Sequence, residues 1–258
     1  MLSQVNIEEP MLSDLSNDPQ LPVQPQQSAP ALTIHHLDNS RSQRLFWLLE
    51  ELELPYEVKN YKRGPDQRAP KELVEVHPLG KSPIITDGDL TLAESGAIVE
   101  YILQKYGGTK LQPSGDAAKV TDLYYTHYSE GSLMPLLVNK IIFSIIPQKS
   151  PIFVRPLLKS VFQKVEKVLL HPELKKHIEL IEAHLKKQTS GWFAGEEHPT
   201  ASDFMMTFPL ELLILQSSKT SATGGDMPEI RKYLKRIHER PAYKKAMEKA
   251  GETYYAEV

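Results

Sequence analysis

The chain has 258 residues, of which 40% are hydrophobic and 24% are charged, and its formal net charge is −3 at neutral pH. This composition is typical of a globular protein, and such a charge gives no electrostatic case for nucleic acid as a partner. The chain contains no cysteine, which excludes disulfides, cysteine-ligated zinc and a cysteine nucleophile. Its length favours two domains.

Residues 1–30 are rich in proline and glutamine, and they contain four acidic residues but no lysine or arginine. Such a segment cannot bury enough apolar surface to offset its ordering entropy, so we predict a disordered arm. Two roles stay open for it, none at all or the binding of a regulatory partner. It lacks the pattern of a signal peptide or a mitochondrial presequence, which favours a cytoplasmic protein.

No apolar run reaches the ~18 residues that a membrane span needs. The longest candidate, Ile141 to Ile146, is followed by Pro147, which we expect to end the helix there. The sequence therefore predicts no membrane span.

Residues 31–108 alternate between strand and helix patterns. Short apolar runs bounded by turn residues predict strands, and apolar residues three and four positions apart predict helices. Asp87-Gly88-Asp89 lies between two apolar pairs and is a hairpin signal. The predicted order is β-α-β-α-β-β-α, with elements at 32–37, 41–53, 56–61, 70–76, a hairpin around 87–89 and a helix that opens at Glu94-Ser95.

A strand, helix and strand with a right-handed crossover, followed by a hairpin, form a thioredoxin-like arrangement. A linker rich in proline and glycine follows at 109–115, and residues 116–258 show helical periodicity only. The sequence thus predicts an α+β thioredoxin-like domain followed by an all-α helical bundle, whose helices we place at 116–137, 153–170, 172–187, 201–216, 228–240 and 242–250. Thr200-Ala201-Ser202-Asp203 predicts a capping box, in which the Thr200 hydroxyl accepts the Asp203 N–H and the carboxylate bonds back.

The stretch from His77 to Tyr101 contains three devices that suit a small anion. An X-Pro bond such as Ser82-Pro83 can be cis at modest cost, and beside a strand it presents backbone polar groups to a ligand. Glu94-Ser95 opens an amphipathic helix, where free N–H groups and the positive end of the dipole collect. The tight turn Asp87-Gly88-Asp89 is the third device, although a capping pair is an ordinary interpretation of Glu94-Ser95.

Two phrases in this stretch, Pro78-Leu79-Gly80-Lys81-Ser82-Pro83 and Leu92-Ala93-Glu94-Ser95, resemble the glutathione-binding half of cytosolic glutathione transferases. The segment Asn39 to Arg44 is similar to fungal and bacterial members, and the resemblance runs from about Leu32 to the end. It implies a detoxifying homodimer that conjugates the glutathione thiolate to hydrophobic electrophiles, with hydroperoxide reduction as a second activity. Glutathione is then the co-substrate, and no cofactor is implied.

The resemblance also implies a residue that stabilises the thiolate. When Arg44 is aligned with the arginine of the theta-like Ser-x-x-x-Arg pattern, Ser40 falls on the serine that donates to the glutathione sulfur. Asn39 and Ser42 are the alternatives if the alignment slips, and Ser40 as a plain helix cap is another interpretation. No tyrosine lies in the first strand or its turn, which argues against a tyrosine mechanism.

For the remainder of glutathione, the resemblance implies five contacts. Glu94 and Ser95 hold the γ-glutamyl end, and Lys81 meets the glycyl carboxylate. Ser82 and Pro83 present main-chain groups to the cysteinyl unit, which leaves the Ser82 side chain nearly free to vary.

Three tyrosines, Tyr124, Tyr125 and Tyr128, are candidates for the electrophile pocket, with core packing as the alternative. His35 and His36 are adjacent in a strand and point to opposite faces, so they cannot chelate one metal ion together. We predict no metal site. The alternative function is a transferase-like binding or regulatory protein with a vestigial glutathione site.

Overall fold

The computed structural model describes residues 32–218 and 226–251, so the predicted arm lies outside the described residues. Its sheet has four strands, β1 (Leu32–Leu37), β2 (Tyr56–Tyr61), β3 (Ile84–Asp87) and β4 (Leu90–Ala93), in the order β2-β1-β3-β4. β1 is parallel to β2, and the other two pairings are antiparallel. The parallel pair is joined by a helical crossover and the last pair by the predicted hairpin.

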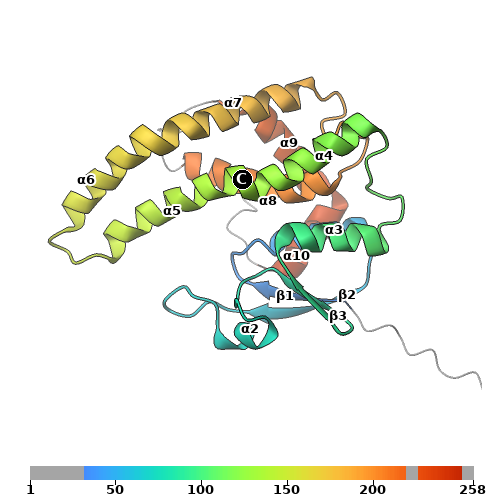
Figure 1. Cartoon of the computed structure of the whole chain (residues 1–258), viewed down its shortest axis with the longest axis horizontal. Helices are drawn as coiled ribbons and strands as arrows, with labels where there is room; N and C mark the ends of the chain where they lie inside the picture. Colours follow the sequence, from blue (N-terminus) through green and yellow to red (C-terminus); the bar gives the residue numbers. More distant parts are fainter. Residues whose placement is uncertain (1–31, 219–225, 252–258) are drawn as a thin grey trace, which may run out of the picture.

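Helices cover both faces of this sheet. Because successive strand residues point to opposite faces, Ile34 and Ile85 pack toward α1 (Gln43–Glu51) and α3 (Ser95–Tyr106). Leu37 and Ile84 pack with Leu73 of α2 (Lys71–Val76) on the opposite face. Figure 1 shows α2 below the sheet and the helical domain on the other side. The predicted β-α-β-α-β-β-α order and thioredoxin-like fold are therefore confirmed.

The rest of the described chain is helical, as predicted. Two π-helical turns, η1 (Ser129–Leu133) and η2 (Glu166–Leu170), join neighbouring helices into continuous segments at 116–149 and 155–187. The helices are α4 (Asp116–Tyr128), α5 (Met134–Lys149), α6 (Arg155–Val165), α7 (His171–Lys187), α8 (Ala201–Ser218), α9 (Pro228–Glu239) and α10 (Pro241–Ala250).

Each π turn ends two residues before a proline, Pro135 after η1 and Pro172 after η2. A proline ring clashes with the carbonyl four residues earlier in a regular α-helix and donates no N–H. The wider π turn accommodates both effects, and the helix continues. The predicted break before Pro172 is therefore wrong, and so is the predicted end at Pro147, because α5 continues through it to Lys149.

The continuous helix Asp116–Lys149 is long and apolar enough to cross a membrane by length and composition alone, with a mean hydropathy of 1.3 in its best window. This helix was not predicted, because the sequence was interpreted as a helix at 116–137 and a separate short apolar run, Ile141 to Ile146, ended by Pro147. Only 28% of that window is buried within the protein. A core helix of a globular protein can meet the same criteria.

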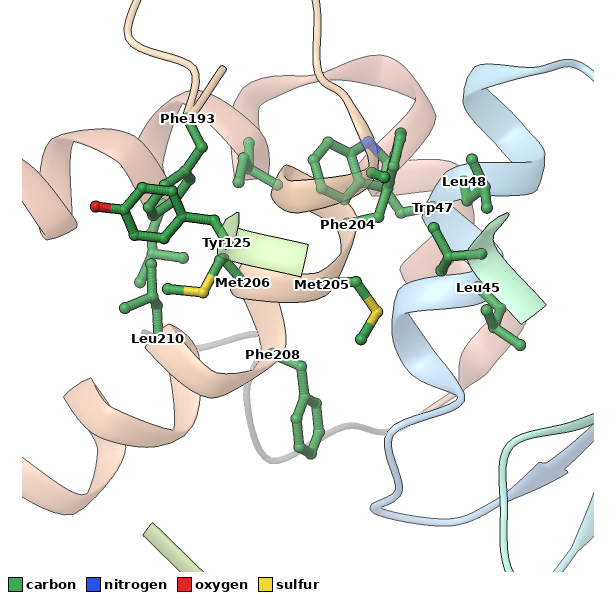
Figure 2. Packing of buried hydrophobic residues seen from close by; sticks show 14 of the residues in the cluster. Leu45, Trp47, Leu48, Tyr125, Phe193, Phe204, Met205, Met206, Phe208 and Leu210 are labelled. Carbon is green, nitrogen blue, oxygen red and sulfur yellow. The ribbon is translucent and has the colours of Figure 1, made fainter. Parts of the chain in front are cut away.

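α1 connects the two halves of the protein, and eight of its nine residues are buried. The Trp47 ring lies 4.5 Å from Phe204 of α8, 6.0 Å from Tyr243 and 6.5 Å from Trp192, measured between ring centroids. Figure 2 shows the Trp47 ring beside Phe204 of α8. The sheet domain is thus fixed to the helical domain through α1.

Asp203 is a buried hub of the helical domain. Its carboxylate accepts the N–H groups of Phe193 at 3.0 Å and Thr200 at 2.8 Å, and the Tyr233 hydroxyl at 3.0 Å. The predicted bond from the carboxylate back to Thr200 is confirmed. The predicted bond to the Thr200 hydroxyl is wrong, because that hydroxyl donates to Asp122 of α4 while the Asp203 N–H bonds the Thr200 carbonyl.

We expect Asp203→Ala to lower the free energy of unfolding by at least about 3 kcal/mol. It leaves three buried donors without an acceptor, each costing ~1 to 3 kcal/mol. Denaturant unfolding followed by circular dichroism measures this. Asp203→Asn keeps the shape and one acceptor oxygen, so its loss is smaller.

Burial also raises the pKa of Asp203 to about 6 from its ordinary value of 3.8. Ionisation therefore costs stability above pH 6, and the cost disappears as the carboxyl protonates toward pH 4. Asparagine cannot titrate, so the stability of the wild type relative to Asp203→Asn should rise between pH 6 and pH 4. A pH-independent difference would contradict this.

Candidate active site

The register of the sheet brings the predicted site residues to one edge. His35 of β1 pairs with Ile84 of β3, and Ile84 pairs with Ala93 of β4. The end of β1, the start of β3 and the end of β4 therefore meet. Ser40 lies just after β1, Ser82-Pro83 lies just before β3, and Glu94-Ser95 lies just after β4.

The Ser82-Pro83 peptide bond is cis. The Ser82 hydroxyl donates to the His35 carbonyl at 3.1 Å and accepts the Leu37 N–H at 3.4 Å, so it fixes the proline loop to β1. It also lies 3.1 Å from the Ser40 hydroxyl. The expectation that the Ser82 side chain is nearly free to vary is therefore wrong.

Ser40, Ser42 and Ser82 form a serine cluster. The Ser40 and Ser42 hydroxyl oxygens are 2.7 Å apart, and Ser42 Oγ is 2.7 Å from His36 Nδ1. Ser42 is completely buried and Ser40 is 7% exposed. A chain of hydrogen bonds thus runs from a buried histidine to the edge of the sheet.

His36 determines the direction of these hydrogen bonds. Burial lowers the pKa of His36, so the ring is neutral at neutral pH. A neutral ring carries a hydrogen on only one nitrogen, and in the tautomer with that hydrogen on Nε2 the Nδ1 atom is free to accept. Nδ1 is then an acceptor, and the Ser42 hydroxyl donates to it.

This arrangement leaves the Ser40 hydroxyl as the adaptable donor of the cluster. Ser42 donates to His36 and Ser82 donates to the His35 carbonyl, so either flanking oxygen can accept the single hydrogen of the Ser40 hydroxyl. Ser40 can therefore rotate its O–H from a neighbouring serine to an anion without breaking either anchor. The sequence analysis missed the role of His36, for which the only signal was its position six residues before Ser42.

Asn39, an alternative to Ser40, has a positive φ of 50° in the turn after β1. Its carbonyl oxygen accepts from Arg63, and its side-chain oxygen Oδ1 is buried without a hydrogen-bond partner among the described residues. Among the described residues, the side-chain oxygen of Asn39 thus makes no hydrogen bond to the serine cluster.

Glu94 is the residue before α3, with a φ of 73°, and its side chain makes no capping bond to that helix. The carboxylate is exposed, whereas Ser95 is buried at the first position of α3. Lys81 is exposed on the proline loop. These positions leave a carboxylate, a helix N-terminus and an ammonium group around the serine cluster.

Arg44 anchors α1 beneath the site. Its guanidinium is wholly buried and forms an ion pair with Glu130 at 3.0 Å, and Arg41 pairs with the same carboxylate at 3.3 Å. Burial lowers the pKa of Arg44 to about 10, so it stays charged at neutral pH. Glu130 belongs to η1, and the sequence analysis missed it because the π turn was not anticipated.

The structure separates the three candidate tyrosines. Tyr125 is 4% exposed and lies 4.6 Å from Phe193, and the Tyr128 hydroxyl contacts His177 of α7. These contacts are inside the helical domain and favour the core-packing interpretation (Figure 2 shows Tyr125 beside Phe193). Tyr124 is 51% exposed.

His35 and His36 point to opposite faces of the sheet. His35 bonds Tyr61 and Thr86, whereas His36 bonds Ser42. In the part of the chain that the structure describes, no cluster of three or more His, Cys, Asp or Glu side chains could hold a metal ion.

Two protein families match this chain. Glutathione S-transferase, N-terminal domain, matches residues 31–104, and Glutathione S-transferase, C-terminal domain, matches residues 153–250. Glutathione S-transferase 3 of Schizosaccharomyces pombe is 35% identical over 84% of this chain and 87% of its own length. Glutathione S-transferase 1 of Saccharomyces cerevisiae is 35% identical over 86% of this chain and 97% of its own length.

A solved structure agrees with these relatives. A glutathione S-transferase from Actinobacillus pleuropneumoniae superposes with a TM-score of 0.68 at 30% identity, over 88% of this chain and 95% of that one. The chain belongs to the glutathione S-transferase family. It is an enzyme of the glutathione transferase class.

The bond between His36 and Ser42 can be tested by a double-mutant cycle. His36→Phe and Ser42→Ala each leave one buried polar group unpaired, whereas the double variant removes both. We expect the double variant to lose less unfolding free energy than the two single losses added together, by about 0.5 to 3 kcal/mol. Urea unfolding measures all four proteins, and strict additivity would contradict the bond.

Proposed function

We propose that this transferase is of the serine type, theta-like in mechanism, and that Ser40 donates a hydrogen bond to the glutathione thiolate. The observation that carries the proposal is the position of the Ser40 hydroxyl, between Ser42 and Ser82 and next to the cis Pro83. Both neighbours are anchored elsewhere, so Ser40 has the hydrogen that can turn to sulfur.

The energy required matches what one such hydroxyl supplies. A free thiol has a pKa near 8.5, so about 3% is ionised at neutral pH. Lowering that pKa by about 2 units needs about 2.7 kcal/mol. A charge-assisted hydrogen bond contributes about 1.5 to 3 kcal/mol, and the start of a helix adds up to about 1.

The remaining groups would bind the rest of glutathione. The exposed Glu94 carboxylate suits the γ-glutamyl ammonium group, and the N–H groups at Ser95 suit its carboxylate. Lys81 suits the glycyl carboxylate. Main-chain groups at Ser82 and Pro83 suit the cysteinyl unit, because the cis bond presents them at the sheet edge.

The thiolate would attack a small hydrophobic electrophile, and reduction of organic hydroperoxides would use the same thiolate. We further propose a cytoplasmic, detoxifying enzyme that works as a homodimer. Of the three tyrosine candidates, Tyr124 has the exposure that contact with a ligand or a partner needs.

Changing Ser40 to Ala should raise the pKa of bound glutathione by about 1 to 2 units, because one charge-assisted bond is lost. Glutathione affinity should stay within a few-fold, since the other groups provide most of the binding. Turnover of an aryl halide at pH 7 should fall roughly ten- to a hundred-fold and recover as pH rises.

Asn39→Ala is the matched control and should keep the wild-type pH profile. A shifted profile for Asn39→Ala with a normal one for Ser40→Ala would assign the role to Asn39. If the wild type neither turns over an aryl halide nor binds immobilised glutathione, the serine-type proposal fails.

The homodimer has its own test. Val120, Leu123 and Tyr124 of α4 are exposed by 66%, 57% and 51% and form an apolar patch that an isologous interface would cover. Leu123→Asp should therefore give a monomer in analytical ultracentrifugation at micromolar concentration. Leu180→Asp, on α7, is the control and should remain dimeric; a monomeric wild type would refute the homodimer.

A further inference from the structure

The α5–α6 hairpin, residues 141–165, projects from the body of the protein. Figure 1 shows α5 and α6 running side by side to a turn that lies far from the sheet. No residue of α6 is buried. The hairpin is therefore held mainly by the packing of α5 against α6, including the Phe143 and Phe162 rings at 5.2 Å.

The end of this hairpin is strongly apolar and exposed. Ile152 is 77% exposed and Phe153 is 82% exposed in the turn. Leu157 and Val161 of α6, four residues apart, lie on one face of that helix and are 66% and 47% exposed. Exposed apolar patches of this kind mark surfaces that bind a protein or a membrane.

The hairpin is also strongly basic. Between residues 141 and 165 the chain has Lys149, Arg155, Lys159 and Lys164 and no acidic residue, although the whole chain has a net charge of −3. All four side chains belong to exposed residues. The charged ends of lysine and arginine can lie among lipid headgroups while their methylene chains lie against apolar surface.

We propose that the α5–α6 hairpin docks this protein on an anionic lipid bilayer, with Ile152 and Phe153 inserted among the acyl chains at the interface. Lys149 and Arg155 flank the turn and contact lipid phosphates. Apolar burial and electrostatic attraction together give the peripheral binding that basic amphipathic segments show.

Charge decides between a bilayer and a second copy of the chain. If two hairpins met at a two-fold axis, four positive charges would face four. Like charges placed opposite each other oppose association. An anionic surface, in contrast, neutralises all of them at once.

In this proposal the protein docks on the surface of the bilayer and does not cross it. Within the helix Asp116–Lys149, η1 holds Glu130 against Arg41 and Arg44, and residues of α5 pack into the core of the helical domain. Insertion across the bilayer would remove these contacts from the fold. The exposed turn needs no such rearrangement.

Flotation with vesicles tests the docking. The full-length wild type should float with vesicles of phosphatidylcholine containing about one third phosphatidylserine, and far less with phosphatidylcholine alone. High salt should weaken this binding. Equal binding to both vesicle types, or none to either, would overturn the proposal.

Two pairs of variants separate the contributions. Ile152→Ser with Phe153→Ser should remove the apolar insertion, and Lys149→Ser with Lys159→Ser should lower the partition coefficient about tenfold or more. Leu180→Ser and the pair Lys186→Ser with Lys187→Ser are matched controls on α7 and should bind like the wild type. Aryl halide turnover without vesicles should be normal in all of them.

A tryptophan reporter locates the insertion. Trp47 and Trp192 are buried, so the variant Phe153→Trp carries one indole at an exposed position. Its emission should shift to the blue on anionic vesicles and be quenched by brominated lipids. If the emission of this tryptophan does not change while the protein floats with the vesicles, a different surface docks. If the serine variants instead change the oligomeric state in sedimentation, the hairpin binds a second copy of the chain. Either result overturns the proposal.

Discussion

The burial of α1 between the sheet and the helical domain is the constraint on which the site depends. Trp47 is packed against Phe204 of α8, and the wholly buried Arg44 is neutralised by Glu130 of η1. A buried guanidinium without this carboxylate would carry a large desolvation cost. The two contacts fix α1 to the helical domain, so the turn at its start, which contains Ser40, is held by both domains.

Within the site, His36 determines which hydroxyl groups donate and which accept. A neutral ring with its hydrogen on Nε2 accepts from the Ser42 hydroxyl, and this orientation passes along the cluster to Ser40. The cluster also joins the segment after β1 to the loop before β3 through Ser82. The predicted catalytic hydroxyl and the cis-proline loop are thus one hydrogen-bonded unit.

The sequence was informative where the signal is local. Apolar periodicity and the Asp87-Gly88-Asp89 turn predicted the strands and helices of the first domain, because these depend on near neighbours. The roles of Ser82 and His36 could not be predicted, since their partners lie on other strands or across a turn. Pro147 was misinterpreted as a helix end and Pro172 as a helix start, because a proline that a helix accommodates, in one case after a π turn, leaves no simple sequence pattern.

The distribution of charge connects the hairpin with the rest of the enzyme. The hairpin carries +4 while the whole chain carries −3, so the remainder carries −7. An anionic surface therefore attracts the hairpin more than the rest of the chain. The hairpin is reached from the site along one continuous helix, which passes from Glu130 in η1 into α5. The serine cluster, at the edge of the sheet, thus lies away from the exposed turn of the hairpin (Figure 1).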